Sequence, residues 1–198
     1  MKESTQHISS QSLSTSFKDK MLIPHLKVAK IYADLSSATR LKCGAVLVTP
    51  DNTRVLMCGY NGTLPGMNNQ CEANNITKDD VVHAEQNVLM ACAKYGIKTE
   101  HCVLYCTHSP CIHCAKLIIS AGIKIVVYIE EYRDPAGVEL LKQNNIITLK
   151  ETLNGTTSRT KVYKTRSQHA TVRSKARTNT TNAKARKKVY GNEADTIR

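Results

Sequence analysis

The sequence has no run of apolar residues approaching the roughly 18 that a membrane-spanning helix needs, and its mean hydropathy is -0.33. Residues 1–17 lack a charged segment followed by an apolar block, so they do not resemble a secretory signal. We therefore expect a cytoplasmic protein with no membrane span. Without an export signal, the eight cysteines favour metal binding or burial over a disulfide framework.

Large apolar residues are scarce at the end of the chain. Residues 155–198 contain no Leu, Met, Phe or Trp, and they carry 12 basic residues against two acidic ones. Such a segment buries too little apolar area to offset the entropy lost on ordering, so we expect it to be disordered. Its charge suits an electrostatic arm for RNA, DNA or an acidic partner, and a solvated tail without a dedicated partner is the simpler interpretation.

Most of the net charge of +12 lies in that tail, which leaves the rest of the chain nearly balanced. A chain of 198 residues is long enough for one domain with a sizeable core. We predict three segments, namely a flexible N-terminus (1–18), one folded domain (19–153) and the basic tail (154–198).

Helix and strand patterns alternate within the folded segment. The expected order is helix 20–35, strands 43–49 and 54–60 as a hairpin, a helix from Asp79 or Asp80 to about Gly96, strand 102–107, helix 110–121, strand 124–130, helix 136–144 and strand 146–149. This order predicts an α/β fold, a three-layer α/β/α domain with a five-stranded mixed sheet and crossover helices on both of its faces.

Two short motifs at predicted helix starts carry metal-binding chemistry. The first is His83-Ala84-Glu85, and the second begins at Pro110 and contains Cys111 and Cys114. A catalytic zinc ion takes three protein ligands from His and Cys and leaves a fourth position for water. Cys111 and Cys114 project to one side of a helix start, where the dipole favours thiolate. Glu85 is not needed as a ligand and is suited to carrying protons.

A purely structural zinc site is the alternative for these ligands. Such a site would take a fourth ligand, which His113 or Cys106 could supply, but it would leave Glu85 without a role. A second zinc site is not expected, because residues 63–82 contain Cys71 and no histidine.

The two motifs resemble the signature of zinc-dependent cytidine and deoxycytidylate deaminases, in which H-A-E is followed at a distance by P-C-x-x-C. Here 24 residues separate Glu85 from Pro110. Further stretches are similar to deoxycytidylate deaminases of tailed phages, notably CGAVLV (43–48), GYNG (59–62), SPC (109–111) and VVYIEEYRD (126–134). The resemblance covers roughly residues 20–150 and implies a cytidine-deaminase-like domain.

What the resemblance implies is a hydrolase that converts dCMP to dUMP and ammonia, a step that feeds dTMP synthesis. His83, Cys111 and Cys114 would bind one catalytic Zn²⁺, and Glu85 would move protons from the attacking water to N3 and the leaving amine.

For the substrate and its regulation, the resemblance implies contacts to the nucleotide, effectors and an oligomer. The implied allosteric effectors are dCTP with Mg²⁺, as activator, and dTTP, as inhibitor. The implied oligomer is a homohexamer. The implied substrate contacts are Asn61, Ala84, Ser109 and Tyr132. The implied regulatory segment is Gly59, Tyr60, Asn61 and Gly62. Candidates for holding the substrate phosphate are Arg40, Lys42, Arg54 and Arg133.

Asn61 and Gly62 also form a pair typical of a left-handed turn, which is compatible with a sugar contact.

Two other functions remain open. A tRNA adenosine or polynucleotide cytidine deaminase would share the zinc motif and use the basic tail to bind RNA or DNA. A zinc-dependent nucleic-acid-binding module without catalysis would need the ligands but not Glu85.

Overall fold

The computed structural model describes residues 17–153. The expected basic tail (154–198) and residues 1–16 of the expected flexible N-terminus lie outside the described residues. Within 17–153, no helix is both long and apolar enough to cross a bilayer.

A five-stranded mixed sheet forms the centre of the domain, in the order β2-β1-β7-β8-β9. Its strands are β1 (Gly44–Val48), β2 (Val55–Tyr60), β7 (Val103–His108), β8 (Ile125–Glu130) and β9 (Ile147–Lys150). β1 pairs antiparallel with both β2 and β7, whereas β7, β8 and β9 run parallel. The predicted hairpin and the predicted mixed sheet are both confirmed.

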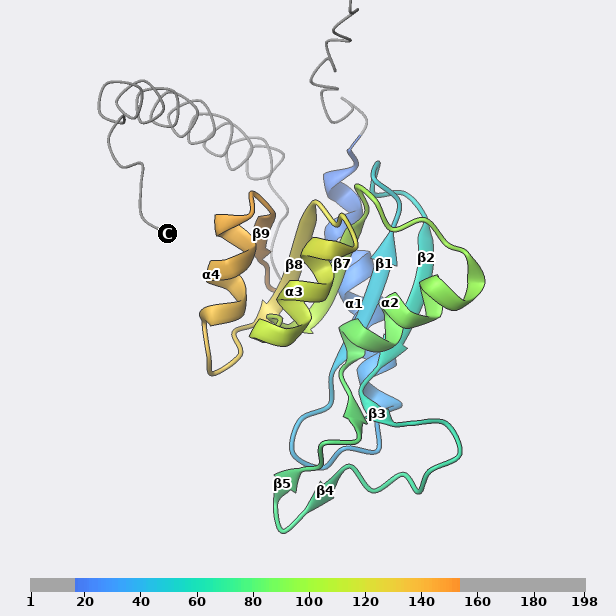
Figure 1. Cartoon of the computed structure of the whole chain (residues 1–198). Helices are drawn as coiled ribbons and strands as arrows, with labels where there is room; N and C mark the ends of the chain where they lie inside the picture. Colours follow the sequence, from blue (N-terminus) through green and yellow to red (C-terminus); the bar gives the residue numbers. More distant parts are fainter. Residues whose placement is uncertain (1–16, 154–198) are drawn as a thin grey trace, which may run out of the picture. The chain divides into compact units, whose positions relative to one another are not determined.

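Helices cover both faces of this sheet (Figure 1). They are η1 (Asp19–Met21), α1 (Leu22–Asp34), α2 (Ala84–Tyr95), α3 (Ile112–Ser120) and α4 (Ala136–Gln143). α2, α3 and α4 share one hydrophobic core with one face, while α1 packs on β1, β2 and β7 from the other face.

The expectation that crossover helices lie on both faces is wrong. Right-handed connections that run from β7 to β8 to β9 in one direction place α3 and α4 on the same face. The opposite layer comes instead from α1, which precedes the sheet in the chain. Its close approach depends on Gly44, where a Cβ would lie 2.0 Å from the carbonyl oxygen of Ala29.

The start of α2 also differs from the prediction, which placed the N-cap at Asp79 or Asp80. β6 (Val81–Val82) pairs instead with β3 (Gly62–Thr63), which keeps this segment extended. His83 is the N-cap, and its backbone N–H donates to Gln86 Oε1 at 3.0 Å in a capping box. The helix therefore begins directly at the first metal-binding motif.

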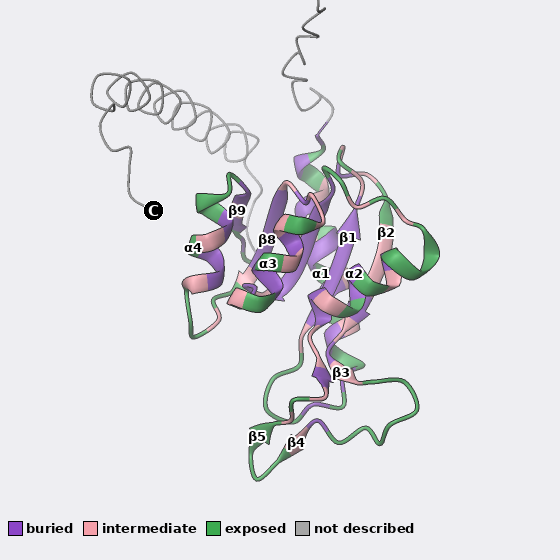
Figure 2. Ribbon diagram, viewed as in Figure 1, coloured by how far each residue is buried: buried purple, intermediate pink, exposed green. Residues whose placement is uncertain are grey.

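A two-stranded ribbon, β4 (Glu72–Ala73) and β5 (Ile76–Thr77), extends away from the main sheet (Figure 1). Figure 2 shows that this extension is mostly exposed, whereas the central strands β1, β7 and β8 are mostly buried. Asn61 and Gly62 do not form the left-handed turn expected of them, because neither has a positive φ. The chain instead runs on from β2 into β3.

Candidate active site

Two helix N-termini bring the predicted metal ligands together. His83 caps α2, Cys111 caps α3, and Cys114 lies in the first turn of α3. His83 Nδ1 lies 3.6 Å from Cys111 Sγ and 3.5 Å from Cys114 Sγ, and the three ligand atoms are within 4.8 Å of one another. Tetrahedral zinc with Zn–S near 2.3 Å and Zn–N near 2.05 Å requires S···N separations of about 3.5 Å. The ligand spacing therefore fits zinc.

The ionisation of these groups also suits a cation. Hydrogen bonds from Cys114 and His83 lower the pKa of Cys111 to about 3, so Cys111 is a thiolate. The same hydrogen bond to Cys111, together with burial, raises the pKa of Cys114, which is the protonated partner of the pair. A metal ion that replaces this shared proton allows both sulfurs to be thiolates.

The ligand set has three members. Within residues 17–153, His83, Cys111 and Cys114 form the one group of His, Cys, Asp or Glu side chains that converges in this way. Cys106 is buried, and burial raises its pKa well above the ordinary value, so it is a neutral thiol. His113 is exposed on α3. Neither proposed fourth ligand joins the cluster, and three ligands are typical of a catalytic site.

Glu85 is buried in the first turn of α2, two residues after His83. Burial raises the pKa of its carboxyl group, although interactions with its own backbone and with His83 act in the opposite direction. A carboxyl group with a raised pKa is suited to taking and returning a proton near neutral pH.

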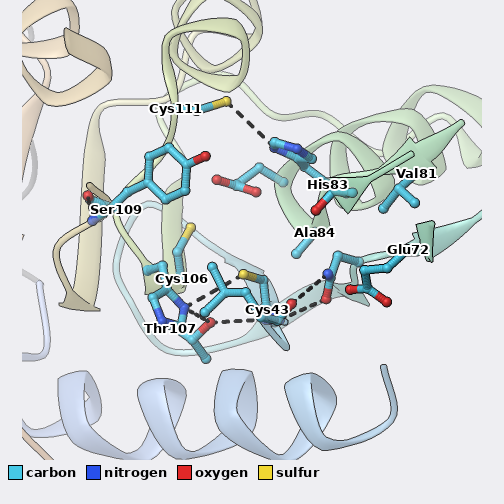
Figure 3. A pocket seen from close by; sticks show the side chains of 16 residues that line it. Cys43, Glu72, Val81, His83, Ala84, Cys106, Thr107, Ser109 and Cys111 are labelled. Atoms are coloured by element: carbon cyan, nitrogen blue, oxygen red, sulfur yellow. Dashed lines mark hydrogen bonds between the residues drawn. The ribbon is translucent and has the colours of Figure 1, made fainter. Parts of the chain in front are cut away.

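These groups open into a pocket with about 650 Å³ of free space, part of it open to solvent. All four residues implied as substrate contacts line it, namely Asn61, Ala84, Ser109 and Tyr132. It lies at the carboxyl ends of the parallel strands β7 and β8, where ligands commonly bind in such sheets. Figure 3 shows Ser109 and Ala84 on different sides of this pocket.

The side chains of Asn61 and Ser109 are each hydrogen-bonded to the main chain. Asn61 Oδ1 accepts a hydrogen bond from the N–H of Cys43 at 2.7 Å, and Asn61 Nδ2 donates to the carbonyl of Leu41 at 2.9 Å. Ser109 Oγ accepts a hydrogen bond from the N–H of Tyr132 at 2.8 Å. Ser109 therefore fixes the chain that carries the Tyr132 ring.

The sequence interpretation missed a side-chain network on the pocket wall. His108 Nε2 lies 3.3 Å from Glu130 Oε2, and His108 Nδ1 lies 3.6 Å from Cys43 Sγ and 3.1 Å from Thr107 Oγ1. Burial raises the pKa of Cys43 to about 12, so it is a thiol and not a reactive thiolate. This network joins the ends of β1, β7 and β8 beside Asn61.

No Lys or Arg is among the described residues that line the pocket. Two candidates for the phosphate contact residues that do line it. Arg40 Nη1 donates to Thr77 Oγ1 at 3.1 Å, and the Arg133 guanidinium lies 5.7 Å from the centre of the Tyr132 ring. Arg54 lies at the other end of β1, where its N–H donates to Thr49. That position removes Arg54 from the candidates.

The segment from Gly59 to Gly62 lies between this pocket and a second groove. Asn61 lines the pocket, whereas Tyr60 and Gly62 line the groove beside α2. Gly59 is buried against Val88 of α2. Five exposed apolar side chains also line the groove, namely Leu35, Leu64, Met67, Met90 and Tyr95.

Comparisons with known proteins agree with this geometry. The family described as "Cytidine and deoxycytidylate deaminase zinc-binding region" matches residues 20–130. ComE operon protein 2 of Bacillus subtilis is 38% identical over 116 residues, which cover 56% of this chain and 60% of that protein. Deoxycytidylate deaminase of Saccharomyces cerevisiae is 30% identical over 132 residues, covering 61% of this chain and 41% of the yeast protein. The chain thus spans about half the length of these curated relatives.

Among solved structures, dCMP deaminase from the cyanophage S-TIM5, crystallised with dCMP and dUMP, is 37% identical with a TM-score of 0.65. The similarity covers 68% of this chain and 99% of the cyanophage chain. Because the family match includes more than half of its residues, the chain belongs to the cytidine and deoxycytidylate deaminase zinc-binding family.

Proposed function

We propose that this protein hydrolyses dCMP to dUMP and ammonia. The observation that carries the proposal is a three-ligand His/Cys/Cys cluster beside a buried carboxyl group, Glu85, in one pocket. The cyanophage relative crystallised with dCMP and dUMP supports the choice of nucleotide. We further propose that the reaction feeds dTMP synthesis and takes place in the cytoplasm.

In this proposal His83, Cys111 and Cys114 hold one zinc ion. Zinc supplies Lewis-acid chemistry that makes water a nucleophile near neutral pH. Glu85 takes one proton from the attacking water and gives it to N3 of the base, and then transfers the second proton, from the oxygen newly bonded to C4, to the leaving amine. Burial of Glu85 supports this role, because it brings the pKa toward the pH at which the carboxyl group must exchange protons.

The other pocket residues bind and orient the nucleotide. The backbone of Ala84 contacts the amino group of the base, and Asn61 contacts the sugar through the Nδ2 hydrogen that remains after its bond to Leu41. Tyr132 forms part of the wall, and Ser109 acts on the substrate by holding Tyr132 in place.

Ammonia release from dCMP by the zinc-loaded protein tests the reaction, with the Glu85→Gln variant as the test of mechanism. Glu85→Gln keeps the shape and loses the exchangeable proton, so kcat should fall by about 10²–10⁴-fold while one zinc per chain is retained. Glu139→Gln, an exposed position on α4, is the matched control. Full activity in Glu85→Gln would refute the mechanism.

Parallel substrates test the choice of nucleotide. Turnover of dCMP but not of CMP, cytidine, dCTP or an adenosine-containing RNA is the expected result. Turnover of the RNA alone would replace this proposal with a polynucleotide deaminase. No turnover of any substrate by the zinc-loaded protein would favour a non-catalytic zinc module.

We also propose that the segment Gly59–Gly62 couples an effector site to catalysis. Its position supports this, because Tyr60 and Gly62 line the second groove while Asn61, between them, lines the pocket. The effectors would be dCTP with Mg²⁺ as activator and dTTP as inhibitor. The dCMP saturation curve should become less sigmoidal with dCTP and Mg²⁺, and an unchanged curve would exclude this role.

We also propose that the protein forms a homohexamer; the exposed apolar side chains along the groove support self-association as such, because a partner subunit would cover them. Light scattering of the zinc-loaded protein measures the assembly directly, and a monomeric mass at micromolar concentration would contradict it.

A further inference from the structure

The charges on the pocket wall are unusual for a site that takes a nucleotide. Two carboxyl groups, Glu72 and Glu85, line the pocket together with the imidazoles of His83 and His108. A phosphate monoester carries between one and two negative charges near neutral pH and is bound by N–H groups and guanidinium groups. Because no described Lys or Arg lines the pocket, we expect the donors to a phosphate at the edge of the pocket.

One set of such donors is already bound to a carboxylate of the chain itself. The N–H of Thr39 lies 3.1 Å and 3.2 Å from the two carboxylate oxygens of Glu72, and the N–H of Arg40 lies 3.2 Å from one of them. Two successive N–H groups that converge on one anion form the concave arrangement that proteins use for phosphate.

The Arg40 side chain belongs to the same arrangement. Its guanidinium donates to Thr77 Oγ1 at 3.1 Å, and both Thr77 and Glu72 belong to the β4–β5 ribbon and line the pocket. Desolvation would raise the pKa of Glu72, but hydrogen bonds from Arg40 and Thr39 outweigh it and lower that pKa. Glu72 is therefore an anion among phosphate-type donors.

We propose that the N–H groups of Thr39 and Arg40, with the Arg40 guanidinium, form the subsite for the phosphate of the nucleotide, and that Glu72 occupies this subsite in the free protein. The inference rests on the proposed function, because it assumes a nucleotide in this pocket. It assigns Glu72 a role in specificity, since a ligand without phosphate gains nothing by displacing a carboxylate.

Electrostatics favours replacement of the Glu72 carboxylate by the phosphate of the nucleotide. The phosphate carries more charge than a carboxylate and offers more acceptor oxygens, so it forms stronger bonds with the same donors. Two anions at one donor set repel each other, so Glu72 leaves when phosphate enters. The β4–β5 ribbon, with strands of two residues each, moves with it.

The β4–β5 ribbon remains attached at its base when Glu72 leaves. Cys71, directly before β4, is buried against Ala38 and Val81, and its Sγ lies 3.4 Å from Ser37 Oγ. The exchange therefore moves the ribbon about a fixed base.

Equilibrium binding of dUMP and deoxyuridine to the zinc-loaded full chain, measured by calorimetry, tests this inference. Glu72→Gln removes the competing charge and keeps the shape, so dUMP should bind at least threefold more tightly while deoxyuridine changes by less than twofold. Arg40→Ala should weaken dUMP binding at least tenfold with the same small effect on deoxyuridine. Arg40→Lys keeps the charge without the planar donor pair and should be intermediate.

Two controls separate specific effects from general ones. Glu139→Gln and Lys27→Ala remove one charge of each sign from exposed positions and should leave both ligands unaffected. Inorganic phosphate distinguishes the phosphate group from the whole nucleotide, and its own inhibition constant against dUMP should be at least threefold lower for Glu72→Gln than for the unmodified protein. Circular dichroism verifies that each variant is folded.

Several results would overturn the inference. They are unchanged or weaker dUMP binding in Glu72→Gln, equal shifts for dUMP and deoxyuridine, unchanged dUMP binding in folded Arg40→Ala, or an equal inhibition constant of phosphate for both proteins. Failure of the proposed function is a separate result. Selective dUMP binding without turnover of dCMP would refute only the reaction, and turnover of dCMP with insensitive binding would refute only the subsite.

Discussion

Gly137 in the first turn of α4 lies directly against the backbone that carries a metal ligand. A Cβ at this position would lie 2.0 Å from the carbonyl oxygen of Pro110 and 2.7 Å from the carbonyl carbon of Cys111. Real Cβ contacts are essentially never shorter than 3.0 Å, so the two segments must separate by about 1 Å to admit a methyl group.

Two effects of Gly137→Ala have opposite signs. Alanine is favoured over glycine in a helix by at most about 1 kcal/mol, which would stabilise α4. Overpacking against rigid backbone costs about 1–3 kcal/mol, and here both contacts are backbone atoms that cannot rotate away. We therefore expect Gly137→Ala to lower the free energy of unfolding.

The displacement should also reach the metal site. Metal–ligand distances tolerate about 0.2 Å, so a shift of about 1 Å at Cys111 should weaken zinc binding at least tenfold. Titration against a chromophoric chelator measures the zinc affinity, and urea unfolding measures stability. Lys142→Ala, an exposed substitution on the same helix, is the control. A Gly137→Ala protein with unchanged zinc affinity and equal or greater stability would refute this reasoning.

Two further predictions concern other parts of the chain. His25 is buried, and its Nε2 lies 3.3 Å from the carbonyl oxygen of Asn52. Burial lowers the pKa of His25 in the folded state. The contribution of neutral His25 to stability is therefore present above pH 6.5 and is lost as the pH falls through the lowered folded-state pKa. Urea titrations from pH 7 to 5 should show that loss, and it should vanish in His25→Gln. Truncation after Leu153 should leave dCMP turnover within twofold, because the pocket residues all precede that position; a large loss at low salt would assign substrate binding to the tail.

Local patterns predicted most of the architecture, because the buried strands and the helices α1, α3 and α4 each carry their own apolar periodicity. The start of α2 could not be predicted in this way. Asp79 and Asp80 are good N-cap residues, but pairing of Val81–Val82 with Gly62–Thr63 keeps that stretch extended. A contact between segments about 20 residues apart outweighed the local preference.

The metal-binding cluster was predictable because its ligands form two compact motifs. The rest of the pocket wall was not, since it depends on pairing between distant segments. Cys43 and His108 meet because the antiparallel register of β1 and β7 extends two steps beyond their last pair, Ala45 and Cys106. Knowledge of the β1–β7 register would have been enough to predict the contact between Cys43 and His108. Glu72 meets Thr39 and Arg40 across more than 30 residues, and nothing in the local sequence signals that contact.

His83 and Cys111 are 28 residues apart in the chain, and the segment between them contains α2 and β7. An ion held by both residues closes that segment into a ring, as a covalent cross-link would. For a loop of this length, the chain-entropy relation for cross-links gives about 3.6 kcal/mol at 25 °C. Loss of the metal would therefore release a helix and a central strand from a shared tether, so removal of zinc should lower the free energy of unfolding of this domain.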